Sequence, residues 1–347
     1  MKVGLIIPRD TPPSGGNARS AERVAEALNR SGVTADVVWF RGSLPRYDVY
    51  HAWNATRVGA TLLAEGVDPA RIMVTWTGTD IGQDWARDPR GWEQRLRRIP
   101  AHVVFTADAR QTLLAEAPDW ADRLSVIAPS VDLSVFRPEG PTLATPHPLV
   151  LVAGGVRPVK QTGWAIELVE CWRRVSAADA HLVVAGPIRD PEEGRRVERL
   201  AADRPWVHLV GDQDSAMMPR WYRTADVVLN SSAVEGVSNA LMEAMACGAL
   251  VVAHNIPGNR ALVEDGVTGR LFDNTAQFGD IMDDVQAHPV RARTFRAAAR
   301  ASMRAHREVH HEADRYARIY RSLVGESTHT LRPDISERRP MGADGAL

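Results

Sequence analysis

Cysteine is scarce in this sequence, and long apolar runs are missing from it. Two cysteines among 347 residues, Cys171 and Cys247, cannot build a disulfide framework. Both fall in apolar stretches with helical character, so we expect structural thiols. No apolar run has the length of a membrane span, and the run in residues 1–8 is too short for a signal peptide. These absences predict a cytoplasmic protein with no integral membrane segment.

An excess of either charge is also missing. The 42 lysines and arginines nearly cancel the 43 aspartates and glutamates, and the formal net charge is −1. This balance gives no general attraction to nucleic acid or to acidic membrane surfaces, so we expect no nucleic-acid partner. Apolar residues make up 44% of the chain, which is enough for the cores of two medium domains.

Short apolar runs alternate with amphipathic stretches, a pattern typical of parallel sheets covered by helices on both faces. Strands are expected at residues 2–8, 33–40, 47–53, 71–76, 102–106, 124–127, 149–152, 181–186, 207–211, 225–229 and 250–253. Helices are expected at 18–30, from 162 onward, and at 240–246, 275–287, 291–306 and 308–324. The proline-containing stretch 140–148 indicates a linker. The expected organisation is an N-terminal domain (1–140), a C-terminal domain (141–307), a last helix (308–324) and a disordered tail (325–347).

Residues 230–248, NSSAVEGVSNALMEAMACG, combine a strand end, a short loop and a helix. Glu235 and Gly236 lie in the loop, where the backbone N–H groups of a helix start attract anions and oxygen atoms. Glu243 lies on the helix, about 9 Å further along its axis than Val237 at 1.5 Å per residue. One carboxylate can therefore hold each end of an extended ligand, although two unrelated surface glutamates would show the same spacing.

The same stretch resembles the signature of the retaining, nucleotide-sugar-dependent glycosyltransferases of family 4. That signature is E-x7-E, and its second glutamate is also the first residue of E-A-M-A-x-G-x-P-V-V. Glu235 and Glu243 match its two acids, and Ala249-Leu250 stands where a small residue and proline are usual. The resemblance implies an α/β fold of the GT-B type, in which two Rossmann-like domains face each other across a cleft. The C-terminal domain then binds the nucleotide, the N-terminal domain binds the acceptor, and the last helix crosses back to the N-terminal domain.

The resemblance also implies residue roles. In the family, the first glutamate and the backbone amides after it grip the donor sugar, and the second glutamate, here Glu243, binds the ribose hydroxyls. A Gly-Gly loop after the first strand faces the donor, although a tight turn would use the same two glycines. The donor-binding residues implied here are Glu235, Gly236, Val237, Ser238, Asn239, Glu243, Gly15 and Gly16. Residues 262–272 resemble the closing hairpin of the family.

Arg157 and Lys160 lie in a glycine-containing loop before a predicted helix. Two cations at a helix start can neutralise a diphosphate leaving group, which is the main electrostatic need of glycosyl transfer. In most of the family the two cations are five or six residues apart, whereas here they are three apart. We therefore expect Glu235, Arg157 and Lys160 to be the catalytic residues, with a solvated basic pair as the alternative for the two cations.

The loop Thr77-Gly78-Thr79-Asp80 follows a predicted strand, at the position where many family members carry a histidine near the reaction centre. Thr79 and Asp80 are candidates for acceptor contact, and an Asx turn or helix cap is the alternative. Residues 256–259 are expected to form a turn. Together with this loop and the R-P-V-K spacing, they resemble a short-chain subgroup that includes the bacterial selenosugar synthases. A sulfur or selenium nucleophile is therefore among the acceptors that the resemblance admits.

No metal or other cofactor is expected. Asp212-Gln213-Asp214 has the D-x-D spacing of metal-dependent glycosyltransferases, but the two cations already offer the charge that a metal would supply. His306, His310 and His311 have near-helical spacing, and a solvated helix face explains them.

The predicted reaction moves a sugar from a nucleotide diphosphate sugar, with UDP or GDP, to a small-molecule acceptor with retention of configuration. A GT-B phosphorylase, an epimerase and an inactive nucleotide-binding relative are the alternatives. The sequence leaves the nucleotide, the sugar, the acceptor and a homodimer open.

Overall fold

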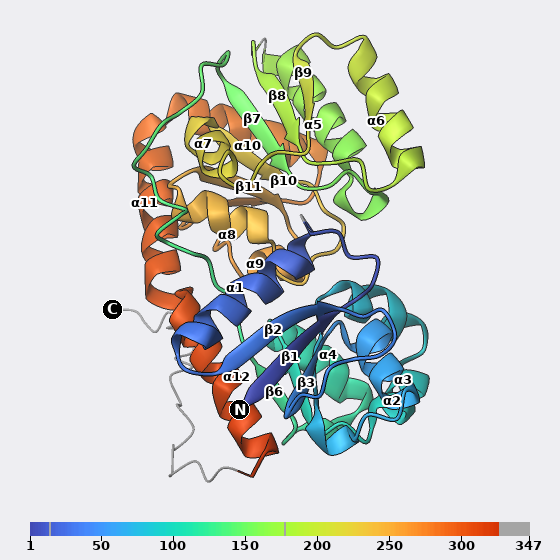
Figure 1. Cartoon of the computed structure of the whole chain (residues 1–347). Helices are drawn as coiled ribbons and strands as arrows, with labels where there is room; N and C mark the ends of the chain where they lie inside the picture. The colour runs from blue at the N-terminus through green and yellow to red at the C-terminus, as the bar shows by residue number, and fades with distance from the viewer. Residues whose placement is uncertain (14, 177, 326–347) are drawn as a thin grey trace, which may run out of the picture.

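The computed structural model describes residues 1–13, 15–176 and 178–325, and these residues form two six-stranded sheets (Figure 1). The first sheet has the order β2-β1-β3-β4-β5-β6 and the second has the order β12-β11-β10-β7-β8-β9. Every strand pairing within them is parallel. The structure therefore confirms the prediction, made from the alternating sequence pattern, of two α/β domains with parallel sheets.

All six strands of the first sheet come from the N-terminal part of the chain. Its strands are β1 (Lys2–Ile7), β2 (Thr34–Trp39), β3 (Val49–Trp53), β4 (Ile72–Thr75), β5 (Ala101–Val104) and β6 (Leu124–Val126). The helices between them are α1 (Gly16–Arg30), α2 (Ala60–Ala64), α3 (Pro89–Leu96) and α4 (Ala107–Glu116), with short π and 3-10 turns at Ala55–Gly59, Pro69–Arg71, Asp80–Trp85 and Pro118–Trp120. The apolar run of β1 is buried on both faces, which explains its lack of alternation.

The second sheet begins after the predicted linker. Its strands are β7 (Leu149–Ala153), β8 (His181–Ala185), β9 (Val207–Gly211), β10 (Val227–Asn230), β11 (Leu250–His254) and β12 (Arg270–Phe272). Its helices are α5 (Thr162–Ser176), α6 (Pro191–Ala202), α7 (Met218–Thr224), α8 (Asn239–Ala246), α9 (Pro257–Arg260), α10 (Thr275–Ala287) and α11 (Pro289–His306), and a 3-10 turn spans Pro158–Lys160. The predicted boundary at residue 140 lies in the connection between β6 and β7.

Two sequence-based expectations in the second domain need correction. Residues 262–272 do not form a hairpin, because Arg270–Phe272 joins the sheet edge as β12, parallel to β11. The predicted turn at 256–259 is the start of the short helix α9. The sequence interpretation also missed α6, which carries a clear start signal: Asp190 caps it by accepting from the Glu193 N–H at 2.8 Å, and Pro191 follows.

The last helix, α12 (Val309–Leu323), packs on the first sheet rather than on the second (Figure 1). Tyr320 on α12 is fully buried, and its hydroxyl lies 2.7 Å from His51 Nδ1 on β3. His51 Nε2 lies 2.7 Å from the hydroxyl of Thr75 on β4, and burial lowers the pKa of His51 to about 3. A neutral histidine therefore joins α12 to two strands of the first sheet.

Three remaining expectations concern the tail, the two cysteines and membrane-spanning segments. The predicted tail, apart from Gly325, lies outside the described residues. Both cysteines are free thiols: Cys171 is half-buried on α5, and Cys247 is buried directly after α8. Within the described ranges, none of the helices combines the length and the apolar character needed to cross a membrane.

Candidate active site

The loop after β10 folds back onto the last residue of that strand. Asn230 donates through Nδ2 to Ser238 Oγ at 3.1 Å and to Glu235 Oε1 at 3.3 Å. Its Oδ1 accepts from the Ser232 backbone N–H at 3.0 Å. Asn230 and Ser232 are buried. This loop therefore holds Glu235 at the carboxyl end of the second sheet, the edge where open α/β sheets bind ligands.

Three donors converge on one oxygen of Glu235. Lys160 Nζ lies 2.5 Å from Oε1, Ser232 Oγ lies 2.8 Å from it, and Asn230 Nδ2 is the third donor. Within residues 1–13, 15–176 and 178–325, no group donates to Oε2. Burial alone would raise the pKa of Glu235, but the charge of Lys160 and these hydrogen bonds outweigh it, so the pKa lies below its usual value. Glu235 is thus an ionised hydrogen-bond acceptor with one oxygen to offer.

The loop after β7 brings the two predicted cations to the same edge of the sheet, but in different environments. It is tied to the β10 loop, because Ala233 N–H donates to the Val159 carbonyl at 2.9 Å and Ser231 Oγ donates to the Lys160 carbonyl at 3.0 Å. Lys160 pairs with Glu235, and its side chain is 19% exposed. Arg157 is exposed, and its side chain makes no hydrogen bond or ion pair with any described residue; its backbone carbonyl accepts from the Lys160 N–H at 2.9 Å. Lys160 is therefore held in place, whereas Arg157 is free to meet an anion.

The helix α8 begins where the two domains touch. Ser238 caps it by accepting from the Leu241 N–H at 3.4 Å. The side-chain amide of Asn239 donates to the Gly16 carbonyl at 3.3 Å and to Ser20 Oγ at 3.0 Å, so it links α8 to α1. Val237 is partly buried against the core of each domain. The predicted donor-binding run therefore also forms part of the domain interface (Figure 1).

Glu243 lies further along α8. Its Oε2 accepts from the hydroxyl of Tyr222 on α7 at 2.7 Å. Burial raises the pKa of Glu243, and the Tyr222 hydrogen bond and the charges of Arg19 and Arg23 on α1 oppose that rise. The second glutamate of the E-x7-E pattern is therefore faced by cations from the other domain.

On the first domain, the predicted glycine pair lies at the start of α1. Gly15 is the N-cap of this helix, has an ordinary extended backbone (φ −75) and donates to the Pro12 carbonyl at 2.8 Å. The N-cap Gly15 has no side chain, and none of the described residues caps α1 with a side-chain hydrogen bond. Gly16 is exposed beside the Asn239 amide. The loop is thus a tight turn that also places a helix start at the domain interface.

The structure places Asp80 in a structural role and leaves Thr79 as the acceptor candidate of its loop. Asp80 is fully buried, and its carboxylate accepts from the backbone N–H groups of Ala55, Thr77, Gly78 and Ile81. Burial raises its pKa to about 6 against the opposing effect of these hydrogen bonds. The Asx-turn alternative therefore describes Asp80, which corrects its assignment to acceptor contact. Thr79 is half-buried.

The loop that Asp80 holds presses against the Glu235 loop across the interface. Gly78 has a positive φ of 106°, and a Cβ built on it would lie 2.4 Å from the Gly236 nitrogen. A Cβ on Gly236 would lie 2.6 Å from the Thr77 carbonyl oxygen. Both glycines are required because only backbones without Cβ atoms can approach this closely.

Replacing Gly78 with alanine is expected to lower kcat/KM at least about tenfold, because the new Cβ forces the two loops apart and the strained backbone costs about 1–3 kcal/mol. Gly66→Ala is the matched control: Gly66 also has a positive φ (+78), but a Cβ there meets nothing within 4 Å. Initial rates of both purified variants test this. Equal losses of kcat/KM in the two variants would contradict the prediction that close contact between the Gly78 and Gly236 loops is needed for activity.

Several residues of the site carry no assigned role from the sequence. Asn230 and Ser232 belong to the quoted motif, but only the fold shows that they hold Glu235. Tyr222 gave no signal, because its partner Glu243 lies on another helix. Asn54 has a positive φ of 104° without being glycine, and its amide joins the Arg57 N–H to Thr77 Oγ1. Asparagine is a frequent non-glycine residue at positive φ, but the sequence alone does not show which asparagine adopts this conformation.

Metal ligands do not gather anywhere in the part of the chain that the structure describes. No group of three or more histidine, cysteine, aspartate or glutamate side chains there could hold a metal ion. Asp212 and Asp214 follow β9, and His310 pairs with Glu308 at 3.2 Å. Metal-independent donor binding stays a prediction.

The segment that carries both cations and both glutamates also matches a known family. Residues 147–287 match glycosyl transferases group 1. This group 1 segment contains β7 to α10, the part of the chain that builds the Glu235 site. A D-inositol 3-phosphate glycosyltransferase of Frankia alni is 33% identical over 204 residues, covering 54% of this chain and 50% of that protein. Glycosyltransferase 1 domain-containing protein 1 of Xenopus tropicalis is 27% identical over 177 residues, covering 51% of each chain.

The chain spans about half the length of the first curated relatives that it matches. Its likeness to solved structures extends further. HepE of Anabaena in complex with UDP and glucose matches with a TM-score of 0.74 at 16% identity, covering 93% of this chain and 100% of that one. Sucrose-phosphate synthase of Thermosynechococcus elongatus matches with a TM-score of 0.75 at 19% identity, covering 94% and 100%. Outside the group 1 segment, the chain therefore resembles these structures in fold. This likeness confirms the predicted GT-B architecture.

Proposed function

We propose that this protein is a retaining glycosyltransferase that moves a sugar from a nucleoside diphosphate sugar to a small-molecule acceptor without a metal ion. The observation that carries the proposal is the ionised Glu235. One of its oxygens is held by Lys160, Ser232 and Asn230, and the other is unoccupied within the described chain. Such a carboxylate suits a sugar hydroxyl. The family match of residues 147–287 supports the same reaction class.

The proposed transfer uses the two cations at the leaving group. Arg157 and Lys160 stabilise the negative charge that develops on the diphosphate as its bond to the anomeric carbon breaks. The Glu235 carboxylate accepts from the donor sugar and holds it in place. The acceptor attacks the anomeric carbon from the face that the diphosphate leaves, and a diphosphate oxygen takes the acceptor proton. The products are the nucleoside diphosphate and a glycoside with retained configuration.

The acceptor side is formed by loops of the first sheet. Thr79 lies in the loop that touches the Glu235 loop, so we propose that it contacts the acceptor. One relative named above is a D-inositol 3-phosphate glycosyltransferase, and the sequence resemblance adds sulfur and selenium nucleophiles. These acceptor classes define the panel for an activity screen. Release of free sugar phosphate in that screen would point to a phosphorylase instead.

Calorimetric titration with UDP, GDP, ADP and dTDP, with and without magnesium, tests the donor half of this proposal. UDP is the first choice because the HepE structure contains it. Micromolar binding of one diphosphate, unchanged by magnesium, is the expected result. No binding by any of the four would overturn the proposal, and binding only with magnesium would overturn its metal-independent part.

A further inference from the structure

Tyr222 on α7 is 1% exposed, and the functional assignments so far give it no role. Its hydroxyl donates to Glu243 Oε2 at 2.7 Å. Its ring packs against Phe136 with 6.2 Å between ring centroids and a tilt of 59°. The ring is therefore fixed by packing, and its one polar atom is directed at the second glutamate of the E-x7-E pattern.

The hydroxyl of Tyr222 is the hydrogen-bond donor that orients the Glu243 carboxylate. Glu243 is half-buried, and a carboxylate partly withdrawn from water is stabilised by a hydrogen-bond donor. Within the described residues, Tyr222 supplies the side-chain hydrogen bond to Oε2, and no group donates to Oε1. A carboxylate held by one oxygen presents the other in a fixed direction, as Glu235 does in the same domain.

We propose that Tyr222 is a positioning residue that aims Glu243 Oε1 at the ribose hydroxyls of the donor nucleotide. This inference rests on the proposed function, and it takes the ribose role of Glu243 from the resemblance of residues 230–248 to the E-x7-E signature. It predicts that the Tyr222 hydroxyl contributes to discrimination between a ribonucleotide and a nucleotide without ribose hydroxyls. A tyrosine that only filled the core would contribute to folding and not to that discrimination.

Tyr222→Phe tests the inference because it keeps the ring and removes only the hydroxyl. Affinities of the full-length wild type and variant are measured by calorimetry for UDP and 2′,3′-dideoxy-UDP. The wild type is expected to prefer UDP at least about tenfold, the size of a hydrogen bond to a charged group. In the variant, UDP should bind about five- to tenfold more weakly while the dideoxy form is unaffected, so the preference narrows.

The matched control is Tyr320→Phe, which removes the hydroxyl of another buried tyrosine, one bonded to His51 in the first domain. It should leave both affinities unchanged. Melting temperatures of the variants check that they are folded. If GDP proves to be the bound diphosphate, the probes are GDP and 2′,3′-dideoxy-GDP.

A pH series adds a readout that packing damage would not produce. Burial raises the pKa of Glu243, and the Tyr222 hydrogen bond, Arg19 and Arg23 counteract this. Cys247, at the end of α8, has a thiol pKa of about 12 and stays neutral throughout. Loss of the Tyr222 hydrogen bond raises the pKa of Glu243 further. As the pH is lowered, Glu243 is therefore protonated at a higher pH in the variant than in the wild type, and the preference for UDP should disappear at that higher pH. Phosphate ionisation affects the affinities for UDP and 2′,3′-dideoxy-UDP equally, so it cancels in the ratio of the two.

The outcomes separate the inference from the proposed function. A wild type that binds none of the diphosphates contradicts the function itself. A wild type that prefers UDP, together with a variant that keeps the same preference or weakens both nucleotides equally, overturns the role of Tyr222 alone. A wild type that binds both nucleotides equally well removes the ribose role of Glu243, and the inference fails with it.

Discussion

Glu235→Gln is expected to lower kcat/KM at least about a hundredfold, comparable to removing an oxyanion-hole donor. The substitution keeps the size of the side chain but replaces the carboxylate with an amide. In the wild type, Oε1 accepts hydrogen bonds from Lys160, Ser232 and Asn230, and Oε2 is the oxygen that would accept from a sugar hydroxyl. An amide cannot accept at both positions, and it leaves the half-buried Lys160 without its counter-charge.

The measurement is the steady-state rate of diphosphate release from the donor sugar that the titration identifies. Glu198→Gln is the matched control, because Glu198 is an exposed glutamate on α6 of the same domain. The control should keep its full rate. If Glu235→Gln is folded and turns over at near wild-type rate, Glu235 does not hold the donor sugar and the proposed mechanism is wrong.

Arg157→Ala is expected to lower kcat/KM by a similar factor, at least about a hundredfold, for a different reason. The guanidinium of Arg157 has no partner among the described residues, so its charge is available to the leaving diphosphate. Removal of this charge acts only on ligands that carry phosphate. Affinity for UDP should therefore fall strongly, whereas the weaker affinity for uridine should not change.

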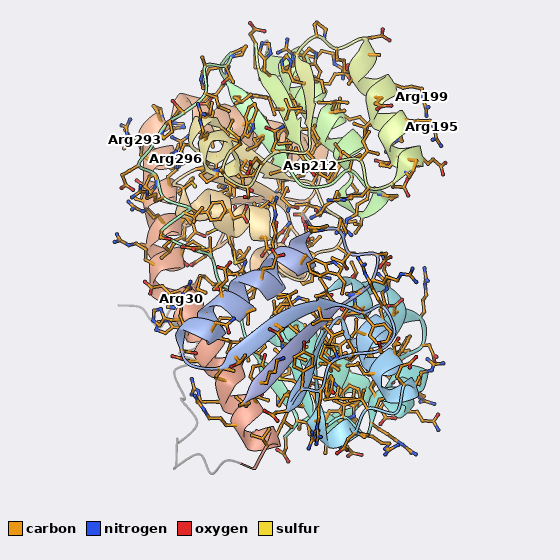
Figure 2. The ribbon with its side chains drawn as sticks, viewed as in Figure 1. Arg30, Arg195, Arg199, Asp212, Arg293 and Arg296 are labelled. Atoms are coloured by element: carbon orange, nitrogen blue, oxygen red, sulfur yellow. The ribbon has the colours of Figure 1, made fainter. Side chains whose placement is uncertain are left out.

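Arg195→Ala is the control for Arg157. Arg195 and Arg199 are exposed and lie on the outer side of α6 (Figure 2). Calorimetry of the control with UDP should match the wild type. Equal weakening of UDP and uridine in Arg157→Ala would show that the arginine supports the fold of the loop rather than the phosphate, and unchanged UDP affinity would remove Arg157 from the site.

The central motif was predictable because its structure is local. The apolar run that ends at Asn230 favours a strand, Ser238 is a typical N-cap, and the residues after it are helix formers. A carboxylate between such a strand and helix must lie at the carboxyl end of the sheet. The sequence therefore identifies Glu235 as a candidate without any knowledge of its neighbours.

Other features needed the fold. Lys160 meets Glu235, 75 residues away in the chain, because β7 and β10 are adjacent in one sheet and their following loops meet at one edge. Asp80 was expected at the acceptor, but the π-helical turn that begins there directs its carboxylate into its own loop. The segment at 262–272 was expected as a hairpin, and pairing with β11 made it an edge strand instead.

The sequence by itself determined the alternation of strands and helices, the two-domain α/β class and the run of residues around Glu235, because hydrophobic period, capping and turn chemistry act within a few residues. Only the tertiary structure decided which groups share the site: Lys160 on Glu235, Tyr222 on Glu243, and Gly78 against Gly236. These contacts depend on strand order and domain packing. Both are set by burial of whole faces across the chain, which no short stretch of sequence encodes.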